Sequence, residues 1–73
     1  MARIEVRSVI SGEVWKIVAK VGDTLAEDDT IMILESMKME IPLTAPEDGV
    51  LREICVAEGS KIGEGQLAAV LET

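Results

Sequence analysis

The middle of the chain reads Glu35-Ser36-Met37-Lys38-Met39-Glu40-Ile41-Pro42, and this stretch joins two copies of one motif. A shift of 37 positions aligns residues 1–36 with residues 38–73 without a gap and leaves Met37 alone between the copies. Repeat proteins that stack their copies need about three or more of them to bury a continuous core. We therefore predict one domain, residues 1–73, whose two halves pack on one another about a pseudo-twofold axis.

The two copies share turn residues and apolar residues. Glycine recurs between short apolar segments, which is typical of strands separated by turns. The identical pairs are Ile4/Ile41, Gly12/Gly49, Ile17/Ile54, Gly22/Gly59, Glu27/Glu64, Leu34/Leu71 and Glu35/Glu72.

The apolar pattern predicts an all-β fold. Since no segment between the Gly and Pro positions keeps a helical period of 3.6 residues, we expect about eight short strands, four in each half. They should form a flattened pseudo-twofold β-barrel of two four-stranded antiparallel sheets. The runs Ile31–Leu34 and Leu67–Leu71 are typical of strands covered on both faces. Apolar positions 14, 17 and 19 break strict alternation and indicate a β-bulge, while Pro42 should lie on an edge strand.

A twofold arrangement has a consequence for the link between the halves. The link should lie on one side of the domain, and both termini can lie on the opposite side. The tip of the link is Met37-Lys38. We therefore predict that Lys38 is exposed at a hairpin tip, far from the termini.

The composition excludes several classes of function. Trp15 is the only aromatic residue, so Val, Ile, Leu, Ala and Met must build the core. The net charge of −7 repels nucleic acid and anionic lipid. One cysteine and no histidine exclude an internal disulfide and a Cys/His metal site. Because the chain also lacks a signal-peptide pattern and a membrane-spanning run, we expect a cytoplasmic protein without nucleic-acid, membrane or metal binding.

The tripeptide Met37-Lys38-Met39 at this tip resembles the attachment site of the biotinyl domains found in biotin-dependent carboxylases and decarboxylases. The resemblance covers the whole chain: the glycines at 12, 22, 49 and 59, the pair Ala45-Pro46 before Asp48-Gly49, and the 35 residues after Lys38 match the family's layout. It implies a biotin carboxyl carrier of the small type without a thumb loop, because the two copies align without a gap.

The same resemblance implies the cofactor and the partners. Biotin would be attached covalently to Lys38 by a biotin protein ligase. It would then carry a carboxyl group between a biotin carboxylase and a carboxyltransferase. An exposed lysine is almost wholly charged at neutral pH, whereas attack on an activated biotin needs the neutral amine, so the ligase must supply the activation.

The residues beside Lys38 are predicted to contribute to recognition. Met37 and Met39 are soft, adaptable side chains suited to contact a ligase and the biotin ring, and Met37 should be the more exposed of the two. Glu35, Ser36 and Glu40 flank the tip on the hairpin.

Other interpretations remain beside the biotin carrier. A lipoyl carrier shares the fold and the amide chemistry, but such domains usually place an acidic residue where this chain has Met37. An unmodified β-barrel interaction module would make the tandem symmetry purely structural. An enzyme is disfavoured, because the chain offers no nucleophile and base constellation. The Met at position 1 and the absence of a linker favour an independent small carrier subunit.

Three residues depart from the repeat or the family pattern. Trp15 corresponds to Arg52 in the second copy, which predicts an outward position. Asp28 stands where the second copy has Gly65, and Asp tolerates left-handed backbone better than most residues. Cys55 is interpreted as a small apolar residue without a reactive role.

The central segment is acidic. From Val21 to Leu51 the chain has eight acidic residues and one basic residue, Lys38. These acids either keep a small carrier soluble or steer the tip toward basic partner surfaces.

Overall fold

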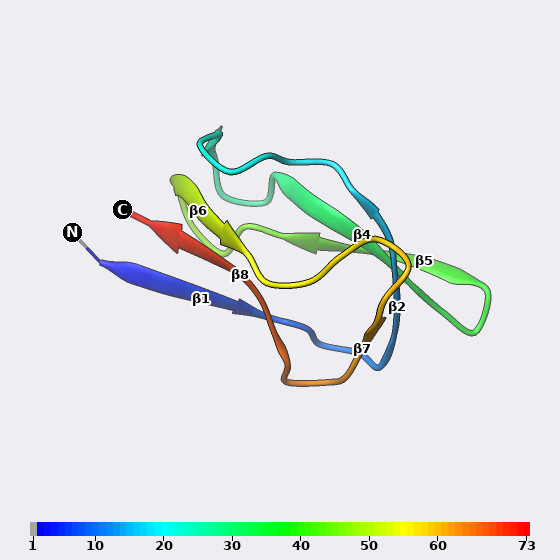
Figure 1. The fold of residues 1–73 in the computed structure, drawn as a ribbon. Coiled ribbons are helices and arrows are strands. Elements are labelled where there is room, and N and C mark those ends of the chain that lie inside the picture. Colours follow the sequence, from blue (N-terminus) through cyan, green and yellow to red (C-terminus); the bar gives the residue numbers. More distant parts are fainter. Residues whose placement is uncertain (1) are drawn as a thin grey trace.

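The computed structural model describes residues 2–73, which form eight β-strands (Figure 1). The prediction of eight short strands, four in each half, is confirmed, and none of the described residues lies in a helix. Residues 2–73 accordingly contain no helix long and apolar enough to cross a membrane. The strands are β1 (Arg3–Arg7), β2 (Gly12–Ile17), β3 (Thr24–Leu25), β4 (Thr30–Ser36), β5 (Met39–Thr44), β6 (Gly49–Ile54), β7 (Lys61–Ile62) and β8 (Leu67–Glu72).

The strands form two four-stranded antiparallel sheets with the orders β1-β8-β6-β3 and β5-β4-β2-β7. Each sheet takes two strands from each half. Replacing every strand by its counterpart in the other half converts one order into the other, as a pseudo-twofold axis requires. The predicted fold class is therefore confirmed. Pro42 lies on β5, an edge strand. The outer side of an edge strand pairs with no other strand, so a residue without an N–H loses no hydrogen bond there.

Backbone hydrogen bonds join the two halves of the chain, and the pseudo-twofold axis relates one bond of each pair to the other. The Gly22 amide donates to the Leu51 carbonyl at 2.7 Å, and the Gly59 amide donates to the Val14 carbonyl, also at 2.7 Å. Each pair joins a turn in one half to a strand in the other. The hairpin between β4 and β5 is thus anchored in a sheet that both halves build.

The bulge expected in the second strand is present. Val14 pairs with Leu34, but Lys16 pairs with Ile33, so Trp15 is the extra residue of β2. Its side chain is 44 % exposed, which confirms the outward position. The equivalent strand β6 carries the same shift at Arg52.

The core lies between the two sheets. The expectation of strands covered on both faces holds for most of each apolar run, although Ile33 and Leu67 are only half-buried. Cys55 is an exposed free thiol and so takes no part in this core. The largest fully buried side chains are Ile31, Met32, Leu34, Leu51, Leu71, Val14 and Val70.

Asp28 adopts the left-handed backbone that its repeat position demands. Its φ is 75°, and that of Gly65 is 82°. The two turns make the same bond, since the Asp28 amide donates to the Ala45 carbonyl and the Gly65 amide to the Ser8 carbonyl, both at 2.8 Å. Asp28 therefore keeps this turn, although a residue with a side chain is strained in the left-handed backbone region.

We expect Asp28→Gly to raise the free energy of unfolding by about 0.5–1 kcal/mol, because relief of left-handed strain exceeds the added entropy of the unfolded chain. Urea denaturation would show a higher midpoint at an unchanged slope. Asp28→Asn is the matched control, since it removes the charge and keeps a side chain. An equal gain in both variants would mean that charge rather than backbone strain destabilises this turn.

Candidate functional site at the hairpin tip

A two-residue turn joins β4 to β5. Ser36 and Met39 form the last strand pair, and Met37 and Lys38 lie between them with φ values of 52° and 67°. Positive φ at both central positions defines a type I′ turn, which usually contains Asn and Gly. Met37 and Lys38 both carry long side chains, and such residues disfavour a backbone with positive φ. Such strain tends to persist at functional sites.

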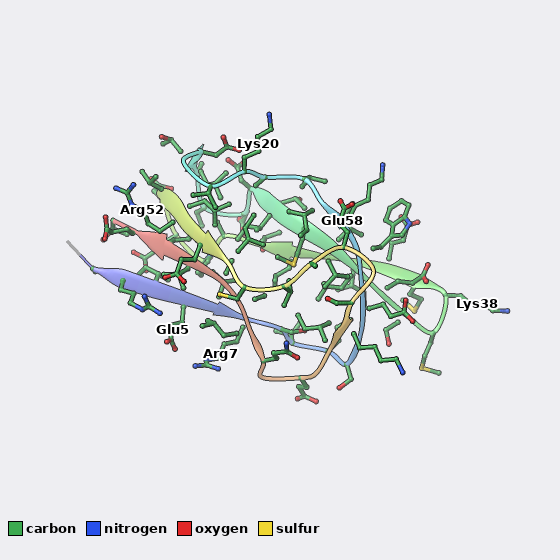
Figure 2. The ribbon with its side chains drawn as sticks, in the orientation of Figure 1. Glu5, Arg7, Lys20, Lys38, Arg52 and Glu58 are labelled. Atoms are coloured by element: carbon green, nitrogen blue, oxygen red, sulfur yellow. The ribbon has the colours of Figure 1, made fainter. Side chains whose placement is uncertain are left out.

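The tip projects from the molecule. Met37 is 92 % exposed and Met39 is 63 % exposed, in the predicted order. Figure 2 shows Lys38 pointing away from the rest of the protein, and Figure 1 places both termini at the other end of the long axis. The Lys38 ammonium makes no hydrogen bond or ion pair with any residue from 2 to 73. The predicted exposure opposite the termini is confirmed.

Three carboxylates form a row behind the tip. Glu35 of β4 lies directly opposite Glu40 of β5 and also opposite Glu13 of β2. All three residues are exposed, and none is in an ion pair within the described chain. Ser36, the other flanking residue, is half-buried. Sequence reasoning identified Glu35 and Glu40 but missed Glu13, which only the strand register brings beside them.

The pseudo-twofold axis shows why Glu35 lacks a cation. Its counterpart Glu72 accepts a bond from Arg52 at 3.0 Å. Trp15 occupies the position equivalent to Arg52 in the first half. The acidic row at the tip is therefore free for cations supplied by another molecule, whereas Glu72, the counterpart of Glu35 near the termini, is paired with Arg52.

An open depression of about 490 Å³ lies beside the tip. Residues from β2, β4 and β7 line it, and Met37 of the turn contributes to its edge. Sequence reasoning did not find this feature, because it depends on how the three strands meet.

The chemistry that the site offers is limited to one free primary amine on a rigid turn. Within residues 2–73 no group of His, Cys, Asp and Glu is placed to hold a metal ion. A deprotonated lysine amine can attack an activated acyl group and form an amide. The arrangement therefore fits a covalently attached group with a carboxyl-bearing tail, such as biotin, delivered in activated form.

Comparison with known proteins agrees with this geometry. The family model described as "Biotin-requiring enzyme" matches residues 5–71. The chain belongs to this family. As a biotinyl domain it requires biotin, and it is a carrier rather than a catalyst.

Relatives include both small proteins and large enzymes. The chain is 40 % identical over 58 residues to a biotin/lipoyl attachment protein of Bacillus subtilis, with 80 % of each chain covered. It is 39 % identical over 67 residues to a biotinylated protein TB7.3 homolog of Mycobacterium leprae, covering 92 % of this chain and 94 % of the relative. Urea amidolyase of Saccharomyces cerevisiae is 38 % identical over 68 residues, which are 93 % of this chain and only 4 % of that enzyme.

Solved structures show the same relation. Urea carboxylase of Kluyveromyces lactis superposes with a TM-score of 0.93 and 32 % identity, covering 99 % of this chain and 6 % of that one. The biotinyl domain therefore spans a small part of the multidomain enzymes that it matches.

Proposed function

We propose that biotin is attached to the Nζ atom of Lys38. The observation that carries this proposal is the type I′ turn, which holds Lys38 exposed at the end of the molecule opposite the termini and without a polar partner among residues 2–73. When attached, biotin supplies a ureido nitrogen that carries a carboxyl group. The lysine stem adds four flexible carbons to its arm, while the paired strands β4 and β5 keep the attachment point fixed.

The partners follow from the carrier role. A biotin protein ligase loads Lys38, a biotin carboxylase supplies the carboxyl group, and a carboxyltransferase passes it to an acceptor bound elsewhere. The carboxylase names among the relatives support this context. We also propose a reducing, cytoplasmic location, which suits the exposed free thiol of Cys55.

A ligase assay tests the proposal against a lipoyl carrier. We expect the purified protein to gain one biotinyl group when incubated with biotin protein ligase, ATP and biotin, and to gain no lipoyl group with lipoate ligase. Intact-mass measurement separates the two products. Lipoylation without biotinylation would mean that the protein carries lipoate and not biotin. The absence of modification by either enzyme would support an unmodified interaction module.

Met37 and Met39 are expected to provide contacts for the ligase, because both are exposed beside Lys38. Replacing either by Ala should slow biotin transfer about tenfold, which corresponds to about 1.4 kcal/mol of lost transition-state binding. The measurement is the second-order rate of biotin transfer. Val21→Ala is the control, because Val21 is an exposed apolar residue outside the tip. A similar loss in that control would remove the specific role of the methionines.

The unpaired acidic row should steer the tip toward basic partner surfaces. We expect Glu35→Gln with Glu40→Gln to slow biotin transfer about threefold to tenfold at low ionic strength and to have little effect at high salt, because rim charges act on association rate and are screened. Fixed-time biotin-transfer assays across a salt series would measure the rate for the wild type and the double variant.

A matched control changes the net charge equally at the opposite end. Glu27 and Glu47 are exposed. Both lie near the start of β6, because the Glu27 backbone amide donates a hydrogen bond to the Asp48 carboxylate. Glu27→Gln with Glu47→Gln should leave the low-salt rate nearly unchanged. If both double variants respond to salt in the same way, net charge rather than the row at the tip determines the rate.

A further inference from the structure

The outer faces of the two sheets have equivalent backbones but different side chains. All three ion pairs found among residues 2–73 lie on the sheet β1-β8-β6-β3. Arg3 donates to Glu53 at 3.3 Å, and Arg52 donates to Glu72 at 3.0 Å. Because the bond between Arg3 and Glu53 reaches from β1 to β6 across β8, it helps to cover Val70 of β8, which is only 2 % exposed. We call this surface the covered face.

The equivalent positions on the sheet β5-β4-β2-β7 leave an apolar surface open. The substitutions between the two faces are Trp15 for Arg52, Ile33 for Val70 and Pro42 for Glu5. Ile33 lies opposite Pro42 on β5 and opposite Lys16 on β2, so the three side chains share one face. The Lys16 ammonium lies 5.8 Å from the centroid of the Trp15 ring, which places these two side chains together. Trp15 and Pro42 are exposed and Ile33 is half-buried. We call this surface the open face.

The acidic row borders the open face on the side nearer the tip. Residues two positions apart on a strand point to the same face of a sheet. The acids and the apolar residues of the open face follow this spacing in three pairs, Glu13/Trp15, Ile33/Glu35 and Glu40/Pro42. An apolar centre with a charged rim is typical of a protein interface. The complementary partner therefore presents an apolar pocket beside a row of Arg or Lys side chains.

The reach of Lys38 indicates which partner this is. Before modification, the reacting amine stands at the end of a four-carbon stem on a turn fixed by β4 and β5. An enzyme that acts on this amine must bring its own surface close to the hairpin and its sheet. An enzyme that acts on the attached group meets it at the end of a longer arm.

We propose that the open face is the surface on which biotin protein ligase docks. Trp15 is the anchor and inserts into an apolar pocket of the ligase, while basic ligase residues pair with the acidic row. The covered face takes no part, so the ligase approaches the domain from one side. This inference rests on the proposed function and adds to it the orientation in which the tip is presented.

An exchange of side chains between the two faces tests the docking. Trp15→Arg gives the open face the residue that the covered face has, and its guanidinium can pair with Glu35 as Arg52 pairs with Glu72. We expect kcat/KM for biotin transfer by the ligase to fall about thirtyfold, as for a central tryptophan of an interface. The fall should come from KM at unchanged kcat, because the contact is equal in ground state and transition state. Trp15→Ala should lower kcat/KM at least about tenfold.

The matched control is the reverse exchange on the covered face. Arg52→Trp should keep kcat/KM within about twofold of the wild type, and thermal unfolding would verify that each variant is folded at the assay temperature. Wild-type kcat/KM in Trp15→Ala, or equal losses in Trp15→Arg and Arg52→Trp, would overturn the docking and leave the proposed function intact. A wild-type protein that gains no biotin would overturn both.

Nuclear magnetic resonance tests the contact itself. The probe is the ¹⁵N-labelled Lys38→Arg variant, which should accept no biotin, mixed with ligase that holds biotinyl-adenylate. Trp15 is the only tryptophan of the chain, so its indole N–H gives a single signal. We expect this signal and the Ile33 amide to broaden more than the amides of Arg52 and Val70, their counterparts on the covered face. Equal broadening of the two sets would contradict docking on the open face.

Discussion

Lys38→Arg is expected to abolish biotin incorporation while leaving the fold intact. Arginine keeps the charge and the length of the side chain, but its guanidinium stays protonated and cannot act as the attacking amine. Lys38 is exposed and makes no polar contact with residues 2–73, so its loss removes no stabilising interaction. Streptavidin blotting after co-expression with a biotin ligase should detect wild type and not the variant.

The controls for this result are the other lysines. Lys16, Lys20 and Lys61 are exposed as well, and each Lys→Arg variant should be biotinylated as the wild type is. Retention of biotin in Lys38→Arg, with loss in one of these three, would move the attachment site away from the tip.

Gly12→Ala is expected to destabilise the protein by about 3 kcal/mol, at the upper end of overpacking effects. A Cβ atom on Gly12 would collide with the backbone carbonyl of Glu35 and approach the Cβ of Ser36 to 3.2 Å. Strands β2 and β4 would have to separate at the base of the tip hairpin. With a melting-temperature change of roughly 4–8 °C per kcal/mol for a domain of this size, thermal unfolding should occur about 15 °C lower.

The repeat supplies the matched control for this substitution. At Gly49, the equivalent residue, an added Cβ would lie 3.0 Å from the Glu72 carbonyl oxygen, so the neighbouring strand would have to shift by only a few tenths of an ångström. Alanine also restricts the unfolded chain, which favours folding by about 0.4–1 kcal/mol, so Gly49→Ala should change stability by less than about 1 kcal/mol. Equal losses at the two positions would show that the close approach of β2 to β4 is not the cause.

Much of the fold was predictable because the sequence contains the same pattern of strands and turns twice. The matching glycines at 22 and 59 both form turns with positive φ, and the broken alternation between Val14 and Ile17 corresponds to the bulge at Trp15. Pro42 indicated an edge strand correctly, because a residue without an N–H cannot pair on both sides.

The site was predictable only where it is local in sequence. Lys38 and its neighbours follow one another along the hairpin, so the tip could be read directly from the chain. Glu13 joins Glu35 through strand pairing, and Lys61 joins Glu13 in the same way. Such neighbours depend on register, which a β-bulge shifts by one residue. The acidic row and the depression therefore became visible only in the folded protein.

Peptide mapping of the biotinylated protein identifies the attachment site directly. The protein would be co-expressed with a biotin ligase, digested and analysed by tandem mass spectrometry. We predict a single biotinyl group, on Lys38, with Lys16, Lys20 and Lys61 unmodified. Biotin on any of those three lysines in place of Lys38 would contradict it.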